Sequence, residues 1–239
     1  MKVLGVIPAR YESSRFPGKP LINLKGKSMI QRVYEGVKKS KAFYKVIVAT
    51  DDQRIVDHVN SFGGEVLMTS SNHQTGTDRC GEVAKKYLEA DIVMNIQGDE
   101  PLVNVKQLEL LINAFEEKEV NIATLACRET NKENLSNQNR IKVVLNHKND
   151  ALYFSRSVIP FEKSKTEYNY LRHIGLYAFR RDTLEEIVAL KPTPLEKTES
   201  LEQLRWIYNG YTIRVKETNI ETPNIDVPED VEKVLSLIN

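Results

Sequence analysis

Short apolar runs alternate with segments of helical spacing along the first half of the chain. Continuous apolar runs predict buried strands at 3–7, 46–49, 65–68 and 92–96. Between and after these runs, apolar residues recur at helical spacing, starting near Met29, Ile55, Val83 and Leu108. Such alternation is typical of an α/β fold with a mostly parallel sheet. We therefore predict a Rossmann-like, mostly parallel sheet flanked by helices.

The pattern changes between residues 122 and 179. Strand-like segments there follow one another with polar connections in place of helices, at 122–126, 141–145, 151–155 and 174–179. We predict a small β-rich subregion over 122–179, inside a single domain of residues 1–239. Helices at 184–190 and 201–208, a strand at 211–215 and a helix opened by Pro228 complete the chain. Gly210 is expected to end the helix at 201–208, since glycine tolerates the left-handed conformation.

Composition and charge narrow the class of protein. The chain has 239 residues, which suits one large domain, and its formal net charge is +1. A near-neutral chain without a basic stripe argues against nucleic-acid binding. Cys80 and Cys127 form no C-x-x-C pair, so we expect buried thiols and neither a disulfide framework nor a zinc site. The first apolar run stops at Pro8, too early for a signal peptide, and no run is long enough to span a membrane. We expect a cytoplasmic protein.

The unusual polar residues come directly after predicted strands. They lie in the segments 8–19, 50–52 and 97–101. In parallel α/β sheets, ligands bind beyond the carboxyl ends of the strands. The three segments therefore predict a single site.

The segment after the first strand has the composition of an anion-binding loop. Arg10, Arg15 and Lys19 supply positive charge, and Gly18 allows a close backbone approach to a ligand. A solvated basic surface loop has the same composition, but the position after the first strand favours phosphate binding. Pro20 follows Gly18-Lys19, so this is not a Walker A loop, and the chain has no G-x-G-x-x-G motif.

Asp99 is the candidate metal ligand in this part of the chain. It follows an apolar strand and Gly98, and Mg²⁺ prefers one or two carboxylates together with phosphate oxygens and water. Spacing alone leaves a second possibility, which is a turn or helix-capping aspartate. Asp51 or Asp52 is expected to cap the helix near Ile55. Likewise, Thr77 or Asp78 is expected to cap the helix near Val83.

Several motifs, in order along the chain, resemble one enzyme family. The blocks in the first half are Ile7-Pro8-Ala9-Arg10-Tyr11, Ser14-Arg15-Phe16-Pro17-Gly18-Lys19-Pro20-Leu21, Ala49-Thr50-Asp51-Asp52, Thr75-Gly76-Thr77-Asp78-Arg79 and Asn95-Ile96-Gln97-Gly98-Asp99-Glu100-Pro101. Those in the second half are Tyr153-Phe154-Ser155-Arg156, His173-Ile174-Gly175-Leu176-Tyr177-Ala178-Phe179 and Leu201-Glu202-Gln203-Leu204-Arg205. Together they resemble the 3-deoxy-manno-octulosonate cytidylyltransferases, also called CMP-Kdo synthetases.

The resemblance implies a specific reaction. Members of this family transfer CMP from CTP to the anomeric hydroxyl of 3-deoxy-D-manno-octulosonate (Kdo), giving CMP-Kdo and pyrophosphate for lipopolysaccharide biosynthesis. It also implies Mg²⁺ as cofactor and a homodimer built on the β-rich subregion. A cytidylyltransferase for 8-amino-Kdo or sialic acid is an alternative, although residues 13–19 lack the glycine-rich Ser-Lys-Gly segment of sialic-acid enzymes. More distant alternatives are a pyrophosphorylase for another nucleotide and a non-catalytic nucleotide-binding module.

The resemblance also implies roles for individual residues. The expected CTP contacts are Pro8, Ala9, Arg10, Arg15, Lys19, Gln74, Arg79 and Asp99. The expected Kdo contacts are Gln97, Arg156, His173, Tyr177, Glu202 and Gln203. Metal binding is expected at Asp99 and Asp226, and the catalytic set adds Arg10, Arg15 and Lys19 to these two. The loop around Asp226 departs from the family, with Asn224 and Val227 where glycine and threonine are usual.

Several of these residues also have a purely structural interpretation. Tyr177 suits a core aromatic position, Arg156 a surface strand, and Glu202 and Gln203 exposed helix positions. A lone histidine such as His173 is more often structural than functional. The residue patterns alone leave these alternatives open.

Overall fold

The computed structural model describes residues 1–12, 16–164 and 168–238. Its contacts divide the chain into two compact units. Unit 1 comprises Met1–Glu109 and Glu221–Asn239, and unit 2 comprises Leu110–Ile220. The single-domain assignment stays a prediction, and each unit is described by itself. None of the helices in these described ranges combines the length and apolarity needed to cross a membrane.

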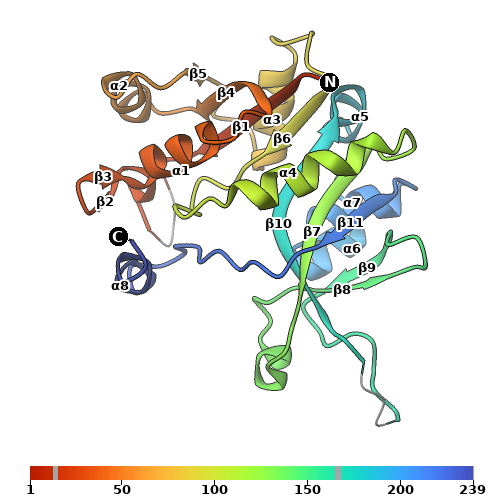
Figure 1. Cartoon of the computed structure of the whole chain (residues 1–239). Coiled ribbons are helices and arrows are strands. Elements are labelled where there is room, and N and C mark those ends of the chain that lie inside the picture. The colour runs from red at the N-terminus through yellow and green to blue at the C-terminus, as the bar shows by residue number, and fades with distance from the viewer. Residues whose placement is uncertain (13–15, 165–167, 239) are drawn as a thin grey trace. The chain divides into compact units, whose positions relative to one another are not determined.

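A parallel sheet forms the centre of unit 1. Its strands lie in the order β6 (Ile92–Asn95), β1 (Val3–Ala9), β4 (Phe43–Thr50) and β5 (Val66–Met68). Every neighbouring pair is parallel. The four apolar runs of the first half form these strands (Figure 1), and β6 is buried throughout. The predicted parallel α/β architecture is confirmed.

Three helices of unit 1 accompany these strands. They are α1 (Met29–Lys38), α2 (Gln53–Ser61) and α3 (Gly76–Ala84). Helix α1 packs on β1 and β4, whereas α3 contacts β1, β4 and β6. The apolar spacing of α1 explains this packing, since its buried side includes Met29, Ile30 and Val33.

The N-terminal caps explain where two of these helices begin. Asp52 caps α2, and its side chain accepts a hydrogen bond from the Arg54 backbone N–H, as predicted. The prediction for α3 was wrong, because Thr75 is the capping residue rather than Thr77 or Asp78. Asp78 stands three positions later, and the two side chains form a reciprocal capping box.

Short elements and the C-terminus complete unit 1. The polar stretch before α1 contains a 3₁₀ turn, η1 (Lys19–Leu21), and a small hairpin of β2 (Asn23–Leu24) and β3 (Lys27–Ser28), which the sequence pattern missed. Helix α8 (Asp230–Leu235) begins two residues after Pro228. Its Val234, with Ile225 and Ile238, joins Leu24 and Met29 in one buried apolar cluster. The C-terminal segment is therefore part of the core of unit 1.

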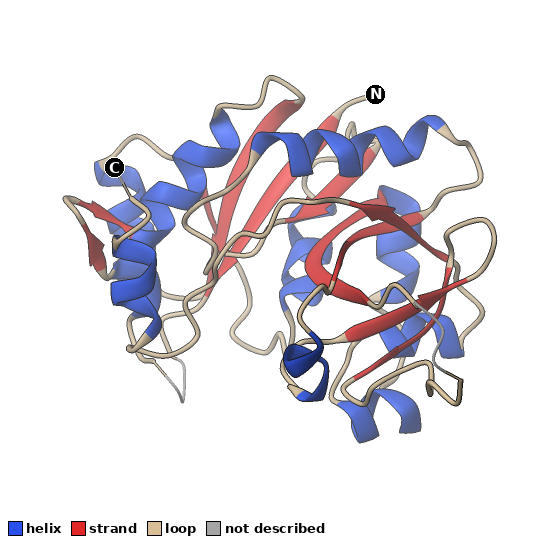
Figure 2. Cartoon of the chain, turned by 60° about the horizontal axis from the view of Figure 1, so that its bottom comes forward, coloured by secondary structure: helices blue, strands red, loops and turns tan. Residues whose placement is uncertain are grey.

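Unit 2 is built on mostly antiparallel strands. Strand β7 (Ile122–Arg128) pairs antiparallel with β10 (Leu171–Arg180) and parallel with β11 (Ile213–Glu217). Strand β8 (Lys142–Leu145) pairs antiparallel with β10 and with β9 (Ala151–Ser155). The strands expected within 122–179 are thus found (Figure 2).

Short helices accompany the strands of unit 2. They are η2 (Ala114–Glu116), η3 (Lys132–Ser136), α5 (Arg181–Ile187), α6 (Pro194–Glu199) and α7 (Gln203–Tyr208). Helix α4 (Val105–Asn113) leads into this unit. Gly210 has a φ of 86° just after α7, as expected for a glycine that ends a helix. Cys80 and Cys127 are both buried free thiols, as predicted.

Candidate active site

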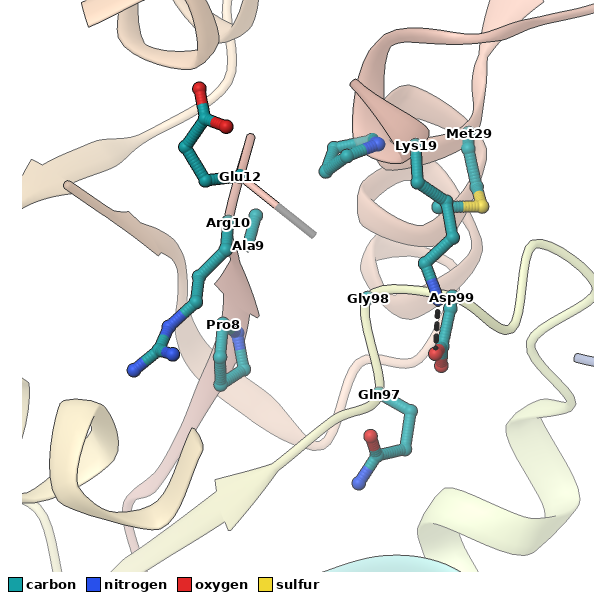
Figure 3. A pocket seen from close by; sticks show the side chains of 10 residues that line it. Pro8, Ala9, Arg10, Glu12, Lys19, Met29, Gln97, Gly98 and Asp99 are labelled. Carbon is teal, nitrogen blue, oxygen red and sulfur yellow. Dashed lines mark hydrogen bonds and ion pairs between the residues drawn. The ribbon is translucent and has the colours of Figure 1, made fainter. Parts of the chain in front are cut away.

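The main cavity of unit 1 lies where the order of the parallel strands reverses. Strand β1 pairs with β4 on one side and with β6 on the other, so chain order runs outward in two directions from β1. Ligands of open α/β sheets bind in the crevice at such a switch point. A cavity of about 410 Å³ is found there. Its walls are Pro8, Ala9, Arg10, Glu12, Lys19, Pro20, Met29, Gln97, Gly98 and Asp99 (Figure 3).

Gly98 explains how the two loops of this cavity come together. A Cβ atom at this position would lie 2.6 Å from the Pro8 carbonyl oxygen. Only glycine therefore lets the segment after β6 lie against the end of β1. Gly18, which precedes the cavity residue Lys19, requires glycine for a different reason. It has a φ of 72° and donates its backbone N–H to the Tyr11 carbonyl oxygen, 2.9 Å away.

The Lys19 ammonium group connects three segments that are far apart in sequence. Its Nζ donates to Asp99 Oδ2 at 2.8 Å (Figure 3) and to the Ile225 carbonyl oxygen, also at 2.8 Å. Asp226 Oδ1 lies 3.9 Å from the same nitrogen. The Lys19 side chain is 15% exposed, that of Asp99 25% and that of Asp226 40%, so solvent screens the Lys19–Asp99 pair less than the contact with Asp226. The structure thus brings Lys19, Asp99 and Asp226 together, as the hypothesis of one site requires.

Backbone contacts hold the two carboxylate-bearing segments side by side. The Ile225 N–H donates to the Asp99 carbonyl oxygen at 3.0 Å. The next residue, Glu100, is held as well, since the Thr222 hydroxyl donates to Glu100 Oε2 at 2.9 Å. The proximity of Asp99 and Asp226 therefore has support that is independent of Lys19.

The Asp226 carboxylate is oriented by its own loop. The Asn224 side-chain amide donates to Asp226 Oδ2 at 2.8 Å, which leaves Oδ1 as the oxygen nearest Lys19. Asp230 Oδ2 accepts the Asp226 backbone N–H at 2.9 Å. Asn224, which stands in place of the family's usual glycine, thus fixes which oxygen of Asp226 turns toward the site.

Asp99 and Asp226 have the chemistry of a magnesium site. In the ranges 1–12, 16–164 and 168–238, no cluster of three or more His, Cys, Asp and Glu side chains is arranged to hold a metal ion. Mg²⁺ does not require such a cluster, because it takes one or two carboxylates and completes its shell with phosphate oxygens and water. The Lys19 ammonium group shows that both carboxylates already face a single cation. The residues present fit the group.

Only some of the other residues predicted to contact the nucleotide line this cavity. Pro8, Ala9 and Arg10 line the cavity, whereas Arg15 lies outside the described residues. A second cavity, of about 360 Å³, shares Arg10 and Glu12 with the first and adds Asp51, Asp52 and Ser71. Sequence analysis did not assign Glu12 or Ser71 to a site, since a single acidic or serine residue in a polar loop carries no distinctive signal.

Arg79 and Gln74 do not line either of these cavities in the described part of the chain. Arg79 is completely buried, and its guanidinium group donates to Thr69 Oγ1 and to Asp51 Oδ2. A direct contact of Arg79 with CTP stays a prediction; in this structure its guanidinium group holds Asp51, which lines the second cavity. Gln74 is exposed, and its amide donates to the Asn72 carbonyl oxygen.

Five of the predicted sugar-acid residues belong to unit 2, and Arg156 differs most from the expectation. Its guanidinium group donates to the carbonyl oxygens of Glu199, Ser200 and Gln138, at 2.6, 3.3 and 3.0 Å. Glu199 also accepts the Arg156 backbone N–H. These contacts tie the end of β9 to the turn between α6 and α7. Arg156 thus positions the start of α7, and its guanidinium group is committed to backbone oxygens.

His173 is neutral and lies next to an irregularity in β10. Burial, with the nearby positive charge of Arg172, lowers its pKa to about 3. The pairing of β10 with β7 shifts between Ile174 and Tyr177, and the Thr124 hydroxyl lies 2.8 Å from the Leu176 carbonyl oxygen there. The same hydroxyl lies 3.0 Å from His173 Nε2, which ties His173 to β7 at this irregularity.

The remaining sugar-acid candidates gather around an aromatic core. Tyr177 is buried, with its ring 5.1 Å from Trp206 and 5.3 Å from His173. Burial and the charge of Glu202 raise its pKa well above the ordinary value. Glu202 and Gln203 begin α7, and Gln203 is buried rather than exposed. Gln97, the sixth candidate, lines the cavity of unit 1.

The fold and the main cavity define a nucleotide-binding α/β protein with a cation and two carboxylates at the switch point of its sheet. Comparisons with known proteins agree. A family model described as cytidylyltransferase matches residues 4–217. The 3-deoxy-manno-octulosonate cytidylyltransferase of Parabacteroides distasonis is 49% identical over all of this chain and 98% of its own. That of Fusobacterium nucleatum is 47% identical over 100% and 97%.

Solved structures give the same result. A structure of CMP:2-keto-3-deoxy-manno-octonic acid synthetase complexed with CTP matches with a TM-score of 0.95 and 44% identity, covering 99% of this chain and 98% of that chain. A 4-diphosphocytidyl-2C-methyl-D-erythritol synthase from Anaerococcus prevotii, at 13% identity and a TM-score of 0.64, shares the fold. The chain belongs to the 3-deoxy-manno-octulosonate cytidylyltransferase family of nucleotidyltransferases.

The lowered pKa of His173 predicts an acid-sensitive contribution to stability. Between the native pKa of about 3 and the ordinary value of 6.5, the unfolded chain binds a proton that the native chain does not. The free energy of unfolding should therefore rise with pH across this window, by at most about 1.4 kcal/mol per pH unit from this residue. In His173→Gln the rise should be smaller, as measured by urea denaturation at several pH values in the window.

The control for this prediction is His147→Gln, at an exposed histidine of unit 2. It should leave the pH dependence as in the wild type. An unchanged slope in His173→Gln would show that His173 is not the buried neutral group inferred above.

Proposed function

We propose that this chain transfers CMP from CTP to the anomeric hydroxyl of Kdo, as a cytoplasmic enzyme that activates Kdo for lipopolysaccharide biosynthesis. Relatives named for this reaction are about half identical over nearly the whole chain. The observation that carries the proposal is the convergence of Lys19, Asp99 and Asp226 at the switch point of the sheet. Cation and carboxylates together suit a triphosphate and its metal ion.

The reaction requires no protein nucleophile. The anomeric oxygen attacks the α-phosphorus of CTP, and the bond from that phosphorus to the bridging oxygen of pyrophosphate breaks. The hydroxyl proton is released, and pyrophosphate leaves with the added negative charge. Catalysis of this kind depends on positioning and charge stabilisation. Arg10, Arg15 and Lys19 are the residues proposed to stabilise the leaving pyrophosphate.

The loops of the cavity contribute positioning. Pro8, Ala9 and Gly98 present backbone at the switch point, and the close contact of Gly98 with Pro8 fixes the width of the crevice. Bound between these loops, a nucleotide is held by main-chain groups whose geometry does not depend on side-chain rotamers. Such preorganisation lowers the entropic cost of reaching the reactive arrangement.

Asp99 and Asp226 are the residues proposed to hold Mg²⁺. Bound there, the ion would lower the pKa of the attacking hydroxyl and neutralise charge that develops on the phosphate. The two aspartates contribute negative charge, and Asn224 holds the Asp226 carboxylate in place through Oδ2. By the resemblance, Gln97, Arg156, His173, Tyr177, Glu202 and Gln203 remain the candidates for contact with Kdo. For Arg156 the structure favours an indirect role, through the position of α7.

The proposed function predicts that Asp99→Asn loses most turnover and keeps its fold. The substitution preserves side-chain size and removes the negative charge, with an expected loss of roughly 10²-fold or more. The measurement is pyrophosphate release with CTP, Kdo and Mg²⁺, repeated with other nucleotides, 8-amino-Kdo and sialic acid.

Asp57→Asn is the matched control, since Asp57 is an exposed residue of α2. It should turn over as the wild type does. Wild-type-like turnover by Asp99→Asn would refute the role of Asp99. Absence of pyrophosphate release from the wild-type protein with CTP and Kdo would refute the proposed function itself.

The Asn224 amide predicts a separate effect on metal dependence. Asn224→Ala removes the donor to Asp226 Oδ2, so the Asp226 carboxylate loses orientation. The Mg²⁺ concentration for half-maximal turnover should rise, by up to about tenfold because the residue is exposed. The KM for CTP at saturating Mg²⁺ should change little. Asn60→Ala, at an exposed position of α2, is the control, and equal Mg²⁺ dependence in both variants would exclude the orienting role.

We also propose that two copies of the chain associate through unit 2. Large apolar side chains there are strongly exposed for a monomer surface: Phe161 at 86%, Leu152 at 56%, and Val158 and Tyr168 at 41% each. All four fall within residues 152–168, in β9 and the segment that follows it. Contact with a second copy would remove this apolar surface from water.

This proposal predicts that Phe161→Glu shifts the protein from dimer to monomer, because a charge would enter the apolar contact. Sedimentation equilibrium measures the association constant. Leu88→Glu is a matched control, at a residue of unit 1 that is 69% exposed, and it should leave association unchanged. A wild-type protein that sediments as a monomer, or equal effects of both substitutions, would contradict association through unit 2.

A further inference from the structure

The Lys19 ammonium group is directed toward the segments of Asp99 and Asp226, the proposed metal ligands, rather than into the open part of the cavity. An ammonium group has three N–H donors. Two of them are used at 2.8 Å, by Asp99 Oδ2 and the Ile225 carbonyl oxygen, and Asp226 Oδ1 lies within 3.9 Å. While these two hydrogen bonds are kept, at most one N–H of Lys19 is left for a phosphate group.

The same geometry makes Lys19 a competitor of a divalent cation. Mg²⁺ takes carboxylate oxygens at about 2.0–2.1 Å. An ammonium nitrogen 2.8 Å from Asp99 Oδ2 would then lie beside a second positive charge at the same carboxylate. Only 15% of the Lys19 side chain is exposed, so solvent screens this repulsion incompletely. The two cations are therefore alternatives at the Asp99–Asp226 pair.

The two carboxylates stay together when Lys19 leaves. The Ile225 N–H to Asp99 carbonyl hydrogen bond and the Thr222–Glu100 contact join the two segments without Lys19. Ile225 itself is fully buried in the apolar cluster that includes Met29 and Val234. Departure of the ammonium group would leave two negative charges held near each other, which is a favourable place for a divalent cation.

We propose that Lys19 is an internal cation that occupies the metal site of the nucleotide-free protein and is exchanged for the divalent ion when the phosphates of CTP draw it away. This inference rests on the proposed function and concerns the regulation of the same site. The exchange couples the two ligands: the metal binds weakly before the nucleotide and strongly with it. By linkage, the divalent ion also favours nucleotide binding by releasing Lys19 from the carboxylates.

The test is metal binding to the nucleotide-free protein, with Mn²⁺ as the probe. Mn²⁺ binding is followed by electron paramagnetic resonance in the wild type and in Lys19→Met, which keeps side-chain length and removes the charge. Mn²⁺ affinity should rise in Lys19→Met, by roughly tenfold if the competition has the size typical of coupled sites. Lys27→Met is the control, because Lys27 pairs with Glu35 elsewhere on unit 1 and its loss changes net charge equally.

Two further variants keep the test decisive. Lys19→Arg retains a cation and should leave Mn²⁺ affinity near that of the wild type. The double variant Lys19→Met with Asp99→Asn should lose the added affinity, which places the gained binding at Asp99. Circular dichroism verifies the fold of each variant, and Lys19→Gln replaces Lys19→Met if the latter does not fold.

Wild-type Mn²⁺ affinity in Lys19→Met, or an equal rise in Lys19→Arg or Lys27→Met, would overturn the proposal. These titrations use no substrate. Their outcome is therefore separate from pyrophosphate release by the wild-type protein, which tests the proposed function. Failure of one experiment does not imply failure of the other.

Discussion

The ion pair of Lys19 with Asp99, extended to the Ile225 carbonyl oxygen and Asp226, is the interaction on which the candidate site depends. It brings three segments of the chain together at the switch point of the parallel sheet. No local pattern can produce this, because the partners are 80 and more than 200 residues apart. The contact requires a C-terminal segment that returns to the first unit of the chain. The apolar cluster around Ile225 and Val234 supplies that return, so the packing of α8 is a condition for the chemistry of the site.

The fold could be predicted largely from hydrophobic spacing. Strands β1 and β6 and the second half of β4 are continuous apolar runs because both faces of a parallel sheet are covered there, and this makes them easy to locate. The edge strand β5 is only partly buried. Short elements such as the β2–β3 hairpin and α6 escaped, since a few residues establish no period. The start of α3 was misplaced because Thr75, Thr77 and Asp78 are all residue types that cap helices. The capping box with Asp78 at the third position selects Thr75.

The charged loops of the candidate site could be predicted from the sequence, whereas the contacts among their side chains could be predicted less well. The position of Lys19 and Asp99 after β1 and β6 follows from the general geometry of α/β sheets. The pairing of Asp226 with that position was implied only by resemblance, because a loop in the last part of the chain carries no indication of where it folds back. Asn224 illustrates the limit further. The residue looked like a departure from the family that put the loop in doubt, yet its amide forms a hydrogen bond to the metal-binding candidate itself.

Arg79 and Arg156 show that a motif can predict which residue is required without predicting which groups its side chain contacts. A guanidinium group away from water is stabilised by each acceptor that its donors meet, and loss of these partners strands a charge in a medium that solvates it poorly. The terminal nitrogens of the buried Arg79 meet Thr69 and Asp51, while its Nε has no partner in the described part of the chain. The half-buried Arg156 meets three carbonyl oxygens. Such a requirement restricts a position to arginine as strictly as contact with a substrate does. Resemblance to a family therefore locates ligand-binding and structural arginines equally well. Only the contacts in the folded protein distinguish an arginine that binds a ligand from one that positions the residues around the site.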